Sequence, residues 1–215
     1  MNLGSENGKL GRKEREFQLR RSEIMAAAMR LFASKGFHST TMSEIAKEAE
    51  FSTGSLYNFF KSKEELYFTL LREKIEQLEG LVRSRKDEAG GAQAKLEAVV
   101  DTLIEYFEEH RYFFQIFATH QEHFEWPMKG ELAEVLRAKY LSFIAELVEV
   151  FKEGIAQGLF KNYEPEELAL CFMGIMNSFI FLWIETEPKV RLREKKPVIL
   201  DIFYQGTEQV SRKSK

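Results

Sequence analysis

Apolar residues recur at helical spacing along almost the whole chain. In its first part, apolar side chains three or four residues apart form stripes that suit one buried face of a helix. Lys35 and Gly36 end the first stripe, as a last-turn cation followed by the glycine that commonly terminates a helix. The helices predicted here span 14–34, 41–49 and 53–60, and a fourth helix opens at Lys63.

The remainder of the chain repeats this pattern in longer segments. The loop Ala89-Gly90-Gly91 and the pair Trp126-Pro127 interrupt the periodicity. Pro165 suits the first position of a helix, where its missing N–H costs nothing. The later helices are predicted over 93–110, 112–120, 129–157, 165–185 and 197–211. The sequence therefore predicts an all-α protein, in which a long helix joins an N-terminal three-helix domain to a C-terminal helical domain.

The segment 165–185 is apolar on every side. Between Leu168 and Ile184, Asn177 and Ser178 are the polar residues, and the run is shorter than the roughly 20 residues of a membrane-spanning helix. A helix of this kind in a globular protein is buried on two sides. We expect one side to face its own core and the other side to face a second copy of the chain. The residues assigned to this dimer interface are Gly174, Ser178, Phe181, Ile202 and Phe203.

The segment 40–65, TTMSEIAKEAEFSTGSLYNFFKSKEE, carries three helix starts in close succession. Thr41 with Glu44, and Ser62 with Glu65, stand at the spacing of a capping box, and Ser52 suits the cap of the helix between them. Two short helices with a tight turn between them form a helix-turn-helix pattern. The second helix offers small polar groups and a tyrosine near its start, which is suited to reading the major groove.

These residues strongly resemble the DNA-binding domain of the tetracycline-repressor (TetR) family. The match covers the motifs Thr40-Thr41, Ile45-Ala46, Ser52-Thr53-Gly54-Ser55-Leu56-Tyr57 and Phe60-Lys61-Ser62-Lys63-Glu64-Glu65-Leu66. It is sharp from about Arg20 to Leu71, and beyond that only the all-helical layout is shared. The resemblance implies base-proximal roles for Ser43, Thr53, Gly54 and Tyr57, and backbone contacts for Thr41, Ser52, Asn58, Lys61 and Lys63. Thr41 and Ser52 are also expected to cap helices.

Glu50 departs from this family pattern, which usually has glycine at that place. Glycine suits a left-handed backbone there, and a glutamate in the same conformation costs roughly 1 kcal/mol. The departure leaves the geometry of the turn open.

Charge and composition add a modest signal. Residues 1–71 hold 11 Lys and Arg against 9 Asp and Glu, whereas the whole chain of 215 residues has a net charge of −3. Residues 1–13 are predicted to be a flexible basic arm, which lies along DNA or is simply a solvated tail. Residues 14–71 are then the DNA-binding domain and residues 72–215 the ligand-binding and dimerisation domain. One cysteine and the lack of an apolar N-terminal segment favour a cytoplasmic protein.

The second domain is rich in aromatic residues on helices that should converge. The resemblance implies a ligand cavity here, although each aromatic residue taken alone is better explained as core packing. Few buried charges are predicted on these faces, which argues against a phosphorylated or highly charged effector and favours an apolar or amphipathic one. Long-chain acyl compounds, aromatic drugs and hydrophobic metabolites all fit. The candidate ligand residues are Phe107, Phe113, Phe117, Phe172, Met176, Asn177 and Phe179.

Metal and catalytic sites have little support. His120 and His123 supply at most two ligands with no cysteine nearby, so neither a metal nor a cofactor is expected. No nucleophile motif or phosphate-binding loop is present. The leading interpretation is a ligand-responsive repressor that binds a palindromic operator as a homodimer and is not an enzyme. The alternative is a helical small-molecule-binding protein or enzyme whose helix-turn-helix pattern is incidental.

Overall fold

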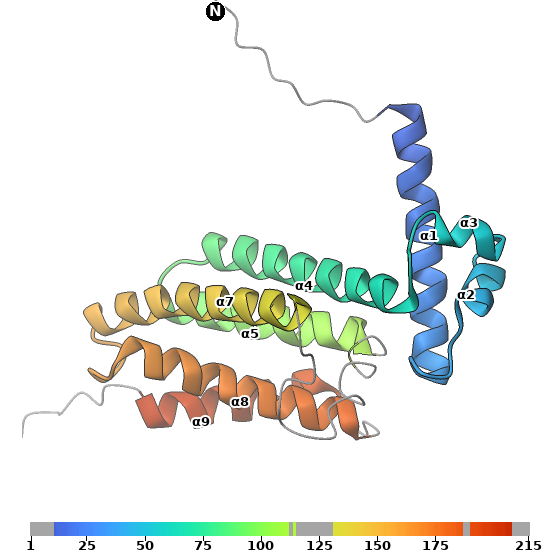
Figure 1. The fold of residues 1–215 in the computed structure, drawn as a ribbon. Helices are drawn as coiled ribbons and strands as arrows, with labels where there is room; N and C mark the ends of the chain where they lie inside the picture. Colours follow the sequence, from blue (N-terminus) through green and yellow to red (C-terminus); the bar gives the residue numbers. More distant parts are fainter. Residues whose placement is uncertain (1–10, 112–113, 115–130, 187–189, 208–215) are drawn as a thin grey trace, which may run out of the picture. The chain divides into compact units, whose positions relative to one another are not determined.

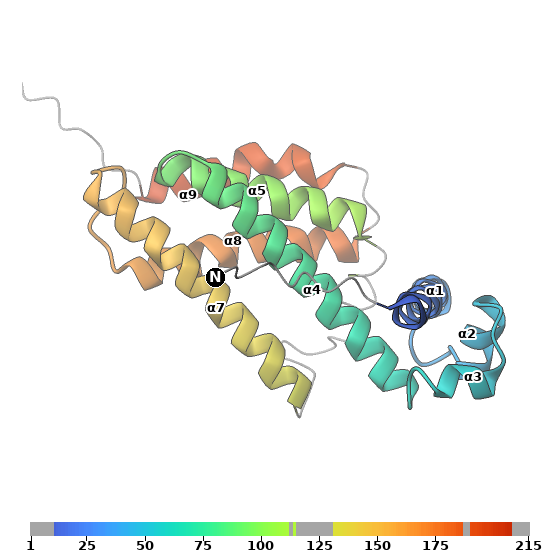
Figure 2. The ribbon, with the colours of Figure 1, turned by 90° about the horizontal axis from the view of Figure 1, so that it is seen from above.

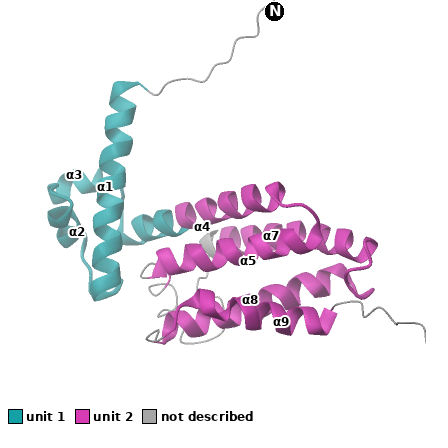
Figure 3. Ribbon diagram, turned by 180° about the vertical axis from the view of Figure 1, so that it is seen from behind, with its two compact units in different colours: residues 1–71 teal, residues 72–215 magenta. Residues whose placement is uncertain are grey.

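The computed structural model describes residues 11–111, 114, 131–186 and 190–207. Over these residues the chain is helical, with α-helices and one 3₁₀ turn, as the periodicity predicts. The chain divides into two compact units, residues 1–71 and 72–215, coloured separately in Figure 3. Helix α4 (Lys63–Glu88) contains the boundary between the units and continues through it without a break.

Unit 1 is a small helical domain. It contains α1 (Arg12–Lys35), α2 (Met42–Glu48), α3 (Thr53–Tyr57) and the start of α4 (Figure 1). Each of the four helices contributes a fully buried apolar side chain to the core of this unit. Phe32, Ile45, Leu56 and Leu66 are all at most 1% exposed.

Two helix ends in unit 1 differ from the predictions. Helix α1 begins at Arg12, so Arg12 and Lys13, which were assigned to a flexible arm, lie in its first turn. Residues 1–10 of that arm lie outside the described residues. Helix α3 ends at Tyr57 rather than at Phe60, because the N–H groups of Asn58 and Phe59 bond three residues back and tighten the chain.

Unit 2 contains α5 (Ala92–Glu109), α7 (Glu131–Ala156), α8 (Pro165–Glu185), the 3₁₀ turn η1 (Leu192–Lys195) and α9 (Lys196–Thr207). Helix α8 packs against α5, α7 and α9 (Figures 1 and 2). The short helix predicted over 112–120 lies outside the described residues, apart from Phe114, which is helical and buried.

Four phenylalanine rings form the centre of unit 2, and this corrects one prediction. Phe203 is 2% exposed, and its ring lies 5.1 Å from that of Phe172 and 5.6 Å from that of Phe151. The ring of Phe160 completes the cluster, 5.5 Å from Phe151. Assigning Phe203 to a dimer interface was therefore wrong. It lies on the buried side of α9, about 100° around the helix from exposed Ile202.

Helix α8 has a buried face and an exposed apolar face. Leu170 and Leu182 are 53% and 60% exposed, and Ile202 of α9 is 50% exposed. The helix is long and apolar enough to cross a membrane by length and composition, with 39% of its most apolar window buried inside the protein. One such helix is weak support for a membrane span, because a core helix passes the same test.

Long side chains hold the second half of α4 within unit 2. The Tyr106 hydroxyl donates to the backbone carbonyl of Lys74 at 2.7 Å, and burial raises the pKa of this tyrosine. Lys139 of α7 pairs with Glu79 at 2.9 Å, and Arg83 pairs with Glu146. Ion pairs that are only partly buried add little stability, but they favour the meeting of these particular helix faces.

Candidate functional site

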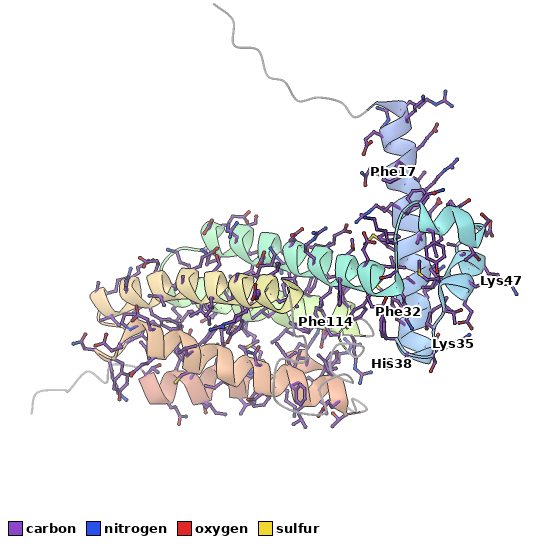
Figure 4. All side chains as sticks on the ribbon, in the orientation of Figure 1. Phe17, Phe32, Lys35, His38, Lys47 and Phe114 are labelled. Atoms are coloured by element: carbon purple, nitrogen blue, oxygen red, sulfur yellow. The ribbon has the colours of Figure 1, made fainter. Side chains whose placement is uncertain are left out.

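Helix α2 starts with the capping box that the sequence predicts. The Thr41 hydroxyl accepts the N–H of Glu44 at 3.2 Å, and the Glu44 carboxylate accepts the N–H of Thr41 at 2.9 Å. The ammonium of Lys35, labelled in Figure 4, donates to the same carboxylate at 2.7 Å. Lys35 and the Thr41 bonds together lower the pKa of Glu44 to about 2. The carboxylate thus stays ionised at neutral pH and keeps the start of α2 fixed.

Helix α3 is fixed in the same way and turns its polar side outward. The Ser52 hydroxyl accepts the N–H of Ser55 at 3.1 Å, and Leu56 is fully buried. On the other side Tyr57 is 50% exposed and Gly54 has open space around it. The outward side chains are those predicted to approach the base edges. Their contact with DNA stays a prediction, as does that of Ser43, Thr53, Asn58 and Lys61.

The turn between α2 and α3 has the left-handed geometry at Glu50 that the glycine of the family pattern suggested. Glu50 has a φ of 60°, and it is the one non-glycine residue with positive φ among the described residues. A β-carbon in this conformation lies too close to the neighbouring carbonyl oxygen. The turn is held by the N–H of Phe51, which donates to the carbonyl of Ala46 at 2.8 Å. The chain therefore keeps the turn despite the cost of the glutamate.

Glu50→Gly is expected to raise the free energy of unfolding by up to roughly 1 kcal/mol, since glycine adopts positive φ without strain. DNA binding should also strengthen modestly, because a negative charge near phosphates is removed. Glu50→Ala is the matched control, because it removes the charge and keeps the β-carbon. Equal melting temperatures for the two variants in calorimetry would show that backbone strain at this position is negligible.

Lys63 corrects a second prediction, because its ammonium is already engaged. It donates to the backbone carbonyls of Phe37 at 2.7 Å and Thr40 at 2.8 Å, and it lies 4.3 Å from the centre of the Phe37 ring. A third carbonyl, that of His38, lies at 3.4 Å. With its three N–H bonds directed at carbonyl oxygens, Lys63 joins the start of α4 to the loop between α1 and α2. The assignment of Lys63 as a phosphate contact is therefore wrong.

Lys63→Met should lower the free energy of unfolding by about 1–3 kcal/mol, since the loop carbonyls lose a charged donor. Lys61→Met is the control, because Lys61 is exposed and such substitutions change stability by about 0.5 kcal/mol or less. Thermal unfolding measures both variants. An unchanged melting temperature for Lys63→Met, together with weaker DNA binding, would restore the phosphate role.

The candidate ligand residues separate into distinct environments. Phe172 and Met176 are buried, and Phe172 belongs to the aromatic cluster of the core. Phe107 and Phe179 are half-buried, and the ring of Phe107 lies 4.1 Å from that of Phe114, labelled in Figure 4. Phe113 and Phe117 lie outside the described residues.

Asn177 lies on the exposed side of α8, next to the face that carries Leu170 and Leu182. Its side chain hydrogen-bonds to the Tyr140 hydroxyl of α7. Burial raises the pKa of Tyr140, and this hydrogen bond partly offsets that increase. The structure therefore gives this amide a partner on a neighbouring helix. A role for Asn177 in binding a ligand stays a prediction.

The remaining dimer candidates lie on the exposed sides of α8 and α9. Gly174 and Ser178 are exposed, and the Ser178 hydroxyl donates to the Gly174 carbonyl at 2.8 Å, which satisfies it within its own helix. Phe181 is half-buried and Ile202 is 50% exposed. A β-carbon at Gly174 would meet open space. Within the described residues there is no group of three metal ligands, and His120 and His123 lie outside them.

One contact in unit 2 was not foreseen from the sequence. The Arg111 guanidinium donates to the carbonyl of Thr186 at 2.7 Å and lies 5.1 Å from the centre of the Trp183 ring. It thereby joins the end of α5 to the end of α8. Sequence spacing carries no signal for this contact, because the partners are more than 70 residues apart.

Comparison with known proteins agrees with these two units. Residues 24–70 match the family model "Bacterial regulatory proteins, tetR family", and residues 89–205 match "Tetracyclin repressor-like, C-terminal domain". The transcriptional repressor KstR2 of Rhodococcus jostii (strain RHA1) is 30% identical over 154 residues, which are 72% of this chain and 74% of that protein.

Two solved structures share the fold. The regulator FadR from Bacillus subtilis, in complex with stearoyl-CoA, superposes with a TM-score of 0.74 and 21% identity, covering 86% of this chain and 98% of FadR. AibR, in complex with isovaleryl coenzyme A and operator DNA, gives a TM-score of 0.67 and 23% identity, covering 87% of this chain and 97% of AibR. The chain belongs to the TetR family of ligand-responsive, DNA-binding transcriptional regulators.

Proposed function

We propose that this protein is a cytoplasmic repressor that binds a palindromic operator as a homodimer and is released by an amphipathic effector carrying an apolar chain. One observation carries the DNA-binding part. A doubly capped helix-turn-helix presents Tyr57, Gly54 and their polar neighbours on an exposed face. We assign residues 1–71 to DNA binding, and residues 72–215 to effector binding and dimerisation.

The exposed apolar face of α8 and α9 supports the homodimer. Leu170, Leu182 and Ile202 are at least half exposed in the described part of the chain, and Gly174 of α8 has no side chain to keep another helix away. Two copies packed through this face form a four-helix interface related by a two-fold axis. Such an interface sets the distance between two recognition helices at about one turn of DNA, as a palindrome requires.

Gly174→Arg tests the homodimer. A β-carbon at Gly174 meets nothing within 4 Å in the single chain, whereas an arginine there places an unpaired charge in the proposed interface. We expect the wild type to be a dimer and the variant to be a monomer by light scattering at micromolar concentration. Gly80→Arg is the matched control, because Gly80 is also an exposed helical glycine with open space and lies on α4. A monomeric wild type would contradict the proposal.

Related proteins support an acyl compound as the effector. The FadR structure contains stearoyl-CoA and the AibR structure contains isovaleryl coenzyme A. In this protein the half-buried rings of Phe107 and Phe179 offer apolar surface to an acyl chain. We propose that an acyl group enters among α5, α7 and α8. The charged part of a thioester then stays outside the apolar interior, which accords with the few charges on these faces.

The switch follows from linkage between two conformations. An effector releases DNA only if it binds the DNA-incompetent state more tightly, and DNA must then weaken effector binding by the same factor. We propose that helix α4 carries the change, because Tyr106, Lys139 and Glu146 hold its second half within unit 2. Because α4 begins in the DNA-binding unit, a shift of this helix changes the position of that unit.

Gel-shift with DNA flanking the protein's own gene tests the whole proposal. We expect the protein to bind this DNA in a salt-dependent way. Long-chain and short-chain acyl-CoA should release the protein from the DNA, whereas charged sugars and nucleotides should not. A thermal-shift panel of the same compounds, with free fatty acids added, separates the acyl chain from the coenzyme. Binding of a compound without any DNA affinity would instead favour a helical small-molecule-binding protein or enzyme.

A further inference from the structure

The first part of α1 extends beyond the core of unit 1. The first buried residue of this helix is Ile24, so the turns from Arg12 onward have little apolar contact to hold them. Phe17 makes the main one, although its side chain is 41% exposed. Its ring stacks on that of Phe59, with centroids 4.7 Å apart and planes 24° apart, and Figure 4 labels its place on the helix.

The partner of Phe17 belongs to the recognition segment. Phe59 stands two residues after the end of α3. Its ring also packs edge-on against that of Phe51, in the turn between α2 and α3, with centroids 6.2 Å apart. The stack therefore joins the start of α1 to both ends of α3. Since Phe59 lies next to α3, the stack holds the first turns of α1 against the recognition segment.

Positive charge is concentrated on the side of α1 that carries Phe17. On this face Lys13 stands four residues before Phe17, and Arg20 and Arg21 stand three and four residues after it. One carboxylate, that of Glu14, shares the face and accepts a hydrogen bond from Gln18, so three cations stand against one anion. The guanidinium of Arg21 lies 5.4 Å from the centre of the Phe60 ring, close to the recognition segment.

The opposite side of this helix differs in charge. Two arginines, Arg12 and Arg15, stand there with two carboxylates, Glu16 and Glu23, and Arg12 pairs with Glu16 at 2.9 Å. Leu19 on that side is 61% exposed. The uneven distribution gives the face shared with Phe17 the character of a phosphate-binding surface.

We propose that Phe17 is a positioning residue for DNA binding. By stacking on Phe59, it holds Lys13 and Arg20 toward the phosphates of the same duplex that α3 reads. This inference rests on the proposed function. Without the stack, the first turns of α1 fray more readily, because helical turns with little tertiary packing are only marginally stable in water. The cations then lose the fixed orientation that makes their contacts favourable.

The test compares Phe17→Ala with Leu19→Ala. The probe is an operator duplex that the wild-type protein selects from randomised DNA, and affinity is measured across a series of KCl concentrations. For Phe17→Ala we expect weaker binding with the same preferred sequence. The slope of log K against log KCl concentration should become shallower by about 1 for each phosphate that the variant no longer neutralises. Leu19→Ala should match the wild type, and Phe17→Tyr should restore both affinity and slope.

A second pair of variants keeps the inference testable if Phe17→Ala folds poorly. Lys13→Gln with Arg20→Gln should reproduce the shallower slope, whereas Arg12→Gln with Arg15→Gln removes the same charge from the other side and should not. Equal slopes for the two pairs, or a wild-type slope for a folded Phe17→Ala, would overturn the positioning role. A wild type that selects no DNA would instead overturn the proposed function.

Discussion

Tyr57→Ala is expected to abolish operator binding while the melting temperature stays almost unchanged. The Tyr57 side chain is 50% exposed on the outward side of α3, so its removal leaves no cavity in unit 1. Each base contact contributes about 1–3 kcal/mol of discrimination, and a homodimer on a palindrome makes this contact at both half-sites. Gel-shift and calorimetry measure the two effects separately.

Leu56→Ala is the matched control for Tyr57→Ala. Leu56 is the neighbouring residue, is fully buried and faces the core of unit 1. Its truncation should cost about 2–5 kcal/mol of folding free energy and affect DNA binding only through unfolding. If Tyr57→Ala unfolds the protein as Leu56→Ala does, the assignment of the outward face is wrong.

Phe203→Ala is expected to destabilise the protein by about 3–5 kcal/mol, which is the usual cost of deleting a buried phenylalanine ring. The ring contacts Phe151, Phe160 and Phe172, so its loss leaves a cavity bordered by three other rings. Gly154 lets the ring of Phe160 pack directly against α7, because a β-carbon there would lie 2.3 Å from that ring.

Ile202→Ala separates core packing from dimerisation. Ile202 precedes Phe203 in α9 and is 50% exposed, so its truncation should weaken the dimer and leave the single chain folded. Dimer dissociation makes the unfolding midpoint depend on protein concentration, whereas loss of core packing lowers the midpoint at every concentration. Denaturant unfolding at several concentrations therefore distinguishes the two variants. A concentration-dependent effect of Phe203→Ala alone would reinstate Phe203 as an interface residue.

Local signals predicted most of the helices. The capping residue Thr41, the proline at 165 and the glycines after α1 and α7 act on the backbone within a few positions of themselves. Each of these helix ends could therefore be predicted from its own neighbourhood. The start of α1 was predicted two residues late, because a basic run with few apolar residues gives no helical stripe to count.

The misassigned residues depend on contacts that spacing does not encode. Lys63 meets carbonyl groups 23 and 26 residues before it, and nothing in its own segment distinguishes it from exposed Lys61. Phe203 and Ile202 are adjacent apolar residues of a helix with apolar groups on several sides. Periodicity could not decide which of them faces the core until the positions of Phe151 and Phe172 were known.

The uninterrupted course of α4 restricts how the two halves of this protein could be recombined. The boundary between the units falls between Leu71 and Arg72, inside a helix rather than in a linker. Adding or removing one residue there turns everything beyond it by about 100° and moves it by about 1.5 Å along the axis. A chimera with another sensor domain therefore has to preserve helical phase at the junction. Insertions of seven residues, close to two full turns, nearly do so, whereas insertions of two do not.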